Sequence, residues 1–274
     1  MSPSPVLSTT WAPSNKENAQ HLSILDLPQE LRDLIYSYTF HVHGAIMPYG
    51  NNPSPMDYTL RAFIVRHKTH GENRRISVYK HISIGLLQTC RQLHAECAPV
   101  LYGDNIFRVG VNSFNDLALA YHQLIRHVTF STDAGDDMFD TNNVGPVSHS
   151  WKSYFWPQVV DSAQKMVLQF PNIKSLTVLV RIMERSTRWR PAFFIMDGGS
   201  AESRVERAAE WMRERCELED DRLRDCLHLE LDMPLPGNYI VPHSSKGAKV
   251  RLLEQEEWDR AEFGHAFELM KVLD

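Results

Sequence analysis

Two amphipathic stretches, separated by an insert, constrain the fold of this chain most. The first begins at Ile24 and reads ILDLPQELRDLIYSYTF, and the second begins at Leu86 and reads LLQTCRQLHAECAPVLYGDNIFRV. In each stretch apolar residues recur every three or four positions, as on one face of an α-helix. A helix of about three turns is marginal alone in water. We therefore expect helices at 28–40 and 84–98 to pack directly on each other, although about 45 residues separate the two stretches.

The apolar stripes predict which side chains make this contact. Burial of a Leu or Ile side chain stabilises by roughly 1.5–3 kcal/mol. Closing a longer loop adds only about 0.6 kcal/mol per doubling of its length. Burial should therefore outweigh the insertion, and the insert should project from the ends of the helices. The expected contacts involve Leu31, Leu34 or Ile35 of the first helix and Leu87, Cys90 or Leu93 of the second.

The insert, at about 44–83, combines a loop-like part with a predicted β-hairpin. Residues 44–60 are rich in Pro, Gly and Asn, whereas the runs RAFIVRHK and RRISVYKH flank a turn that contains glycine. Six basic residues lie within this hairpin and form a candidate basic patch: Arg61, Arg66, Lys68, Arg74, Arg75 and Lys80. This patch is a candidate for binding nucleic acid or an acidic protein. The structural alternative is a charged edge that prevents strands of different molecules from pairing.

The rest of the chain alternates helical and strand patterns. Strands are expected near 125–130, 173–182 and 226–232, each preceded by a helix, which indicates parallel βα units. The phrase FPNIKSLTVLV resembles a leucine-rich repeat unit, but the strands recur at about 50 residues, whereas such repeats run at about 20–29. Residues 1–20 have the composition of a disordered tail. Within them, Lys16-Glu17-Asn18 resembles a KEN degron, with an idle tail as the alternative.

Composition and motifs argue against several classes of function. The net charge of −5 argues weakly against a general nucleic-acid binder. Neither a secretory signal nor a membrane-spanning run is evident, so we expect a cytoplasmic or nuclear protein. The thirteen histidines lack the spacing of zinc ligands, and neither a P-loop nor a G-x-S-x-G motif occurs. We therefore expect no enzyme, cofactor or metal. We also expect buried free thiols at Cys90, Cys97, Cys216 and Cys226.

Together the two stretches resemble an F-box. The first stretch is similar to the opening of an F-box, and the second resembles its later helices, in which a Cys-Arg pair is common. The ordered pair LPxELRxxIY…TCRQ…YGxNxF is similar to that of fungal F-box-like proteins. The resemblance implies that a Skp1-like adaptor contacts the first helix and that the remaining chain recruits a protein for ubiquitination. The implied contact residues are Leu27, Pro28, Glu30, Leu31 and Ile35.

Two alternatives stay open at this point. Leu27, Leu31 and Ile35 also suit a purely structural role in the core. An ordinary F-box has a short connector where this chain has residues 41–83, and the inserted hairpin could cover the face that meets Skp1. Arg91 and Glu96 are expected to form internal ion pairs or hydrogen bonds that fix helix packing.

The predicted fold class is α+β. An F-box-like helical module at 21–108, with the hairpin insertion at about 44–83, precedes an irregular, leucine-rich-repeat-like α/β region at 109–274. The predicted function is protein interaction. The substrate and the oligomeric state stay open.

Overall fold

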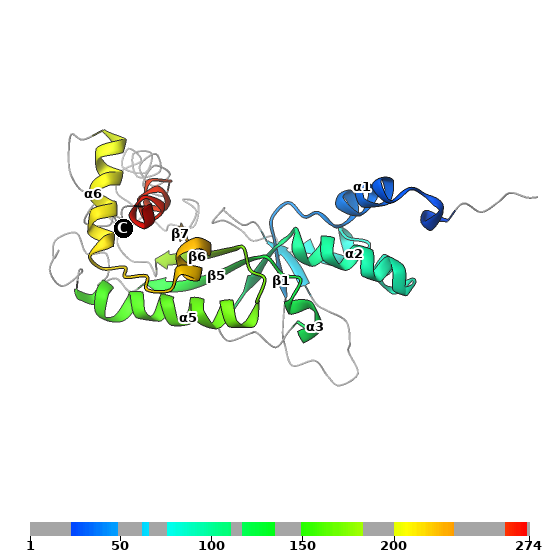
Figure 1. Ribbon diagram of the computed structural model, residues 1–274, viewed down its shortest axis with the longest axis horizontal. Coiled ribbons are helices and arrows are strands. Elements are labelled where there is room, and N and C mark those ends of the chain that lie inside the picture. The colour runs from blue at the N-terminus through cyan, green and yellow to red at the C-terminus, as the bar shows by residue number, and fades with distance from the viewer. Residues whose placement is uncertain are drawn as a thin grey trace, which may run out of the picture.

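The computed structural model describes residues 23–48, 62–65, 76–110, 117–134, 149–182, 200–232 and 261–272. The described part is elongated (Figure 1). Helices α1 (Gln29–Phe40) and α2 (Arg91–Gly103) lie at one end. Helix α6 (Ala201–Arg213) and the helix at 261–272 lie at the other. A sheet runs between the two ends.

The described strands form one seven-stranded sheet, in the order β3-β2-β1-β4-β5-β6-β7. Their bounds are β1 (Ala45–Pro48), β2 (Ala62–Val65), β3 (Ile76–Ser77), β4 (Ile106–Val109), β5 (His127–Ala134), β6 (Ser175–Ile182) and β7 (Leu227–Asp232). Strands β1 to β3 pair antiparallel. From β1 through β4 to β7 every pairing is parallel. The sheet therefore joins strands of the insert to strands of the later region.

The insert differs from its prediction in one respect. Strands β2 and β3 form the expected antiparallel hairpin. However, β1 lies in the segment expected to be a loop, and it pairs with β4 as well as with β2. The prediction that the insert projects from the helix ends is therefore wrong, because β1 extends the main sheet. The small sheet expected near 125–130, 173–182 and 226–232 is the β5–β7 part of this larger sheet.

The second predicted helix is divided in the structure. A 3₁₀ turn covers Ile84–Gln88, and α2 begins only at Arg91. Cys90 lies between them in an extended conformation, and its Sγ accepts a hydrogen bond from the Leu93 N–H as an N-cap. Pro99 does not end the helix, which continues to Gly103. The helical region thus starts later and runs further than its apolar pattern predicts.

Several further elements belong to the described fold. They are the 3₁₀ turns η1 (Ile24–Asp26) and η2 (Val78–Lys80), the helix α3 (Leu119–His122), a π-helical turn (Trp151–Phe155), α5 (Trp156–Gln169) and α7 (Asp221–Cys226). No described helix combines the length and the apolar character needed to cross a membrane.

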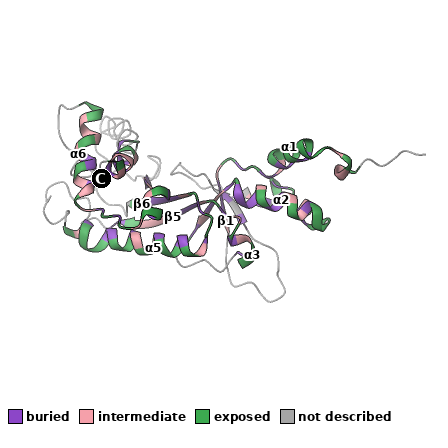
Figure 2. Ribbon diagram, viewed as in Figure 1, coloured by how far each residue is buried: buried purple, intermediate pink, exposed green. Residues whose placement is uncertain are grey.

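Helix α5 covers one face of the parallel strands and forms the centre of the core. Its residues Val159, Ala163 and Met166 are fully buried. The strand residues that face it alternate along each strand, and Figure 2 shows the burial along these elements. On this face of β5 to β7 the buried side chains include Val128, Phe130, Leu176, Val178, Val180, Leu227, Leu229 and Leu231. Because strand side chains alternate between faces, the intervening residues point to the opposite face of the sheet.

The mixed helix and strand content confirms the α+β class. Strands β4 to β7 are parallel and adjacent in chain order, in agreement with the predicted βα units. Leucine-rich-repeat character stays a prediction.

Candidate partner-binding site

One carboxylate on α2 fixes the inward face of α1. The guanidinium of Arg32 donates two hydrogen bonds to Glu96, from Nε to Oε2 at 3.0 Å and from Nη2 to Oε1 at 3.1 Å. The hydroxyl of Tyr36 donates to Glu96 Oε2 at 2.8 Å. Arg32, Tyr36 and Phe40 recur every four residues, so they share one helix face, and all three are buried. This face packs α1 against α2.

Arg32 also fixes the turn that precedes α1. Its Nη1 donates to the main-chain oxygens of Leu25, at 3.2 Å, and Leu27, at 2.8 Å. The Arg32 side chain thus binds both Glu96 on α2 and the turn that precedes α1. This arrangement confirms the interpretation that Glu96 takes part in internal ion pairing. Arg91, by contrast, is exposed and forms no ion pair with a described residue.

The direct contact between the two helices is confirmed, but the predicted contact residues on α1 are wrong. Leu31, Leu34 and Ile35 are 48%, 52% and 37% exposed, and Tyr38 is 81% exposed. On the second side, Leu87 and Leu93 are buried as expected, whereas Cys90 is exposed. The exposed apolar stripe lies beside the buried face of α1, which includes Arg32. Arg32 can be buried there because Glu96, 64 positions away in the sequence, supplies its partner.

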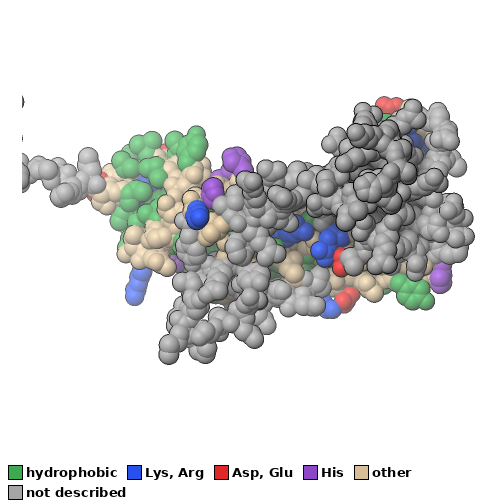
Figure 3. All heavy atoms as spheres, turned by 180° about the vertical axis from the view of Figure 1, so that it is seen from behind, with side chains coloured by type: hydrophobic (Ala, Val, Ile, Leu, Met, Phe, Trp, Pro, Cys, Tyr) green, Lys and Arg blue, Asp and Glu red, His purple; other side chains and the backbone are tan. Residues whose placement is uncertain are grey.

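Leu31, Leu34, Ile35 and Tyr38 form an exposed surface, which we call the α1 apolar face. Their spacing of three and four residues places them on one side of the helix. Figure 3 shows hydrophobic side chains gathered at this end of the molecule. Of the other residues predicted to meet a Skp1-like protein, Leu27 is half-buried, and Pro28 and Glu30 are exposed. A contiguous exposed apolar patch of this kind is typical of an interaction site.

Asn105 joins the ends of both helices, a role that its place in the YGxNxF pattern did not predict. Its side chain is 2% exposed. Nδ2 donates to the main-chain oxygens of Phe40, at 2.8 Å, and Leu101, at 2.9 Å. Oδ1 accepts from the main-chain N–H of Val42 at 2.9 Å. One amide therefore holds the point where the chain leaves α1 next to the end of α2.

The neighbours of Asn105 explain the rest of the YGxNxF pattern. The Tyr102 ring stacks on Phe107, with ring centroids 5.7 Å apart, and on Tyr121, with centroids 4.3 Å apart. Gly103 lies against the next connection, where an added Cβ would sit 3.4 Å from the main-chain oxygen of Leu124. The residues of this pattern therefore form the junction between α2, β4 and the segment that leads to β5.

Residues 3–126 match the family model of the F-box-like domain. The match supports an F-box-like protein. No curated protein matches the chain, and no solved structure does. The matched F-box-like region includes α1, α2 and strands β1 to β4, and it ends at the residue before β5. The insert between the helices thus lies inside the matched region. An F-box-like domain suggests a protein-interaction adaptor role; fungal origin stays a prediction.

The structure brings no other candidate residue of its described part into this site. The basic patch falls outside the described residues except for Lys80, which is exposed at the end of η2. Cys97, Cys216 and Cys226 are buried free thiols, whereas the burial predicted for Cys90 is wrong. Within the described ranges no three His, Cys, Asp or Glu side chains converge as a metal site would require.

The Glu96 network makes a pH-dependent contribution to stability. Hydrogen bonds from Gln92 and Tyr36, followed by the contacts with Arg32, hold the pKa of Glu96 below its usual value of 4.5. A depressed folded-state pKa stabilises the fold above the unfolded pKa and ceases to do so as pH falls through the folded pKa. We expect Glu96→Gln to lower the urea midpoint at pH 7. The difference from wild type should shrink as pH falls below about 4.5.

The exposed Glu30 provides the control for this measurement. Glu30→Gln should leave the urea midpoint near that of wild type at pH 7, because no hydrogen bond to a described residue is lost. A deficit in Glu96→Gln that is equally large at pH 7 and well below pH 4 would contradict a role for the ionised carboxylate.

Proposed function

We propose that this chain is an adaptor that binds a Skp1-like protein through the α1 apolar face. The observation that carries the proposal is the orientation of α1. Its polar and aromatic face is held by Glu96, and its leucines and isoleucine are left outward. The F-box-like match supports an adaptor role for this end of the chain.

The chemistry of the surface suits a protein groove. An amphipathic helix binds a partner by placing residues i, i+3, i+4 and i+7 in an apolar groove. Leu31, Leu34, Ile35 and Tyr38 have this spacing. The exposed Pro28 and the half-buried Leu27 extend the surface beyond the start of α1. The alternative of a core role for Leu31 and Ile35 does not agree with their exposure.

The rest of the chain would present a second surface to a protein that is recruited for ubiquitination. In this proposal the chain acts in the cytoplasm or nucleus by binding alone, without chemistry of its own. The sheet extends away from the α1 end, so a partner on α1 would leave the β5–β7 end accessible (Figure 1).

Capture of the full chain by a purified Skp1 protein tests this proposal. We expect wild type to be retained, and Leu27→Ala with Pro28→Ala to be retained less, because both residues adjoin the α1 apolar face. An ordinary F-box protein serves as the positive control. If the control is captured and wild type is not, the adaptor proposal is wrong, whereas the described fold is unaffected.

A further inference from the structure

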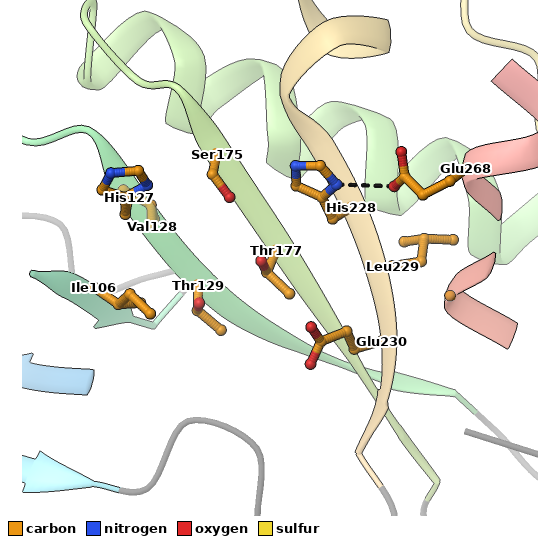
Figure 4. Close-up of a pocket in the computed structure, with 11 residues that line it drawn as sticks. Ile106, His127, Val128, Thr129, Ser175, Thr177, His228, Leu229, Glu230 and Glu268 are labelled. Atoms are coloured by element: carbon orange, nitrogen blue, oxygen red, sulfur yellow. Dashed lines mark hydrogen bonds and ion pairs between the residues drawn. The ribbon is translucent and has the colours of Figure 1, made fainter. Parts of the chain in front are cut away.

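A hollow of about 390 Å³ lies on the face of the sheet opposite α5 (Figure 4). Strands β4 to β7 form its floor, and the helix at 261–272 forms one wall through Gly264 and Glu268. An added Cβ at Gly264 would lie 3.4 Å from the main-chain oxygen of Leu229, so this helix approaches β7 closely. We call this feature the polar hollow.

Polar side chains from neighbouring strands meet on the floor of the hollow. His127 on β5 lies opposite Ser175 on β6. In the next row Thr129 lies opposite Thr177, and Thr177 lies opposite His228 on β7. Figure 4 shows these side chains on the same face of the sheet. Parallel strands are usually apolar on both faces, so a polar row across three of them needs a separate explanation.

The central hydroxyl of this floor, that of Thr177, faces the hollow. Thr177 is only 7% exposed, and its hydroxyl makes no hydrogen bond to a described residue. The half-buried Ser175 and His127 side chains likewise make none within the described part. The Thr177 hydroxyl is not among the described side-chain atoms that are sealed from solvent without a partner, so it is accessible from the hollow. The hollow thus offers three adjacent polar groups to a ligand.

The charges around the hollow restrict the ligand. Burial, followed by the charge of Lys174, lowers the pKa of His127 below 6.5, so its ring is neutral at pH 7 and both donates and accepts. Burial raises the pKa of Glu268, but hydrogen bonds from His228 and Lys271 outweigh it and hold the pKa below its usual value. Glu268 is therefore ionised on the wall that the helix at 261–272 forms.

We propose that the polar hollow binds a primary amide group, such as the side chain of Gln or Asn. An amide offers both donors and an acceptor, as do the hydroxyls of Ser175 and Thr177. A carboxylate would be repelled by the ionised Glu268. An ammonium group cannot accept a hydrogen bond, and it would be repelled by Lys174, whose charge acts on the same His127 ring. The inference does not depend on binding of a Skp1-like protein by α1.

Short peptides provide a direct test on the full chain. The probes are acetyl-Ala-Xaa-Ala-N-methylamides, whose end caps carry no primary amide, and Xaa is Gln, Asn, Glu, Lys or Leu. The readout is the imidazole NMR signals of His127 and His228, assigned with His127→Gln and His228→Gln. For so small a ligand we expect dissociation constants on the order of millimolar for the Gln and Asn probes. The Glu, Lys and Leu probes should bind at least about fivefold more weakly, the difference that one lost hydrogen bond makes.

Matched variants distinguish a loss of ligand contacts on the floor of the hollow from a loss of stability of the fold. Thr177→Val keeps the side-chain shape and should weaken the Gln probe about fivefold, the loss expected for one hydrogen bond. Ser175→Ala, at a half-buried position, should act in the same direction if Thr177→Val folds poorly. Thr132→Val is the control, because Thr132 belongs to the opposite face of β5. No signal change at about 50 mM probe, equal or tighter binding of the Glu or Lys probe, or equal weakening by Thr132→Val would each overturn the proposal.

Discussion

Leu31→Asp combined with Ile35→Asp should abolish capture by a Skp1-like protein without unfolding the chain. Both side chains lie on the α1 apolar face, 48% and 37% exposed, so a charge at either position stays in water in the free protein. In a complex the same charges would be buried in an apolar groove without partners. Apolar anchors of an interface commonly contribute about 2 kcal/mol or more each, so the combined loss should exceed about 100-fold in affinity.

A matched control is available on another helix. Leu168 on α5 is 81% exposed, so Leu168→Asp introduces the same charge at an apolar surface position away from α1. Both variants should unfold at the same temperature as wild type, and only the α1 variant should lose capture. A large drop in melting temperature of the α1 variant would mean that Leu31 or Ile35 belongs to the core. Undiminished capture would mean that a partner binds elsewhere.

The helix contact shows what periodicity can and cannot predict. The spacing of apolar residues predicted both helices and their direct packing, because each needs a surface to cover. It did not predict which side of α1 is buried. The buried side includes Arg32, whose burial depends on Glu96, a residue 64 positions away. An ion pair between distant residues leaves no period in a single sequence, so the apolar stripe was placed in the core when it is exposed.

The sheet shows a similar limit. The strand pattern near 226–232 predicted β7, and in the structure Leu229 lies on one face of that strand and His228 on the other. Such patterns could not predict that β1 pairs with β4, because β1 is four residues long and ends in a proline. The polar hollow depends on the lateral register of four strands, which places Thr177 between Thr129 and His228. Register across parallel strands is set by their connections and packing, so a single sequence does not reveal it.

Asn105→Leu should be strongly destabilising. The substitution keeps the side-chain volume but removes both donors and the acceptor at a position that is 2% exposed. The main-chain N–H of Val42 and the oxygens of Phe40 and Leu101 would then lose their partners in the interior. An unsatisfied buried polar group costs about 1–3 kcal/mol, so we expect a loss of about 3–5 kcal/mol in the free energy of unfolding. Urea unfolding measures it directly.

Asp104→Leu is the control for this prediction, since it places the same side chain at the adjacent, exposed position. A surface change of this kind typically alters the free energy of unfolding by less than about 0.5 kcal/mol. Equal losses in the two variants would mean that a leucine anywhere in this turn is harmful and that the hydrogen bonds of Asn105 are not the cause. A loss confined to Asn105→Leu would show that the amide holds α1 on α2. The orientation of the α1 apolar face then depends on Asn105 as well as on Glu96, and capture by a Skp1-like protein should weaken in this variant even at temperatures where it remains folded.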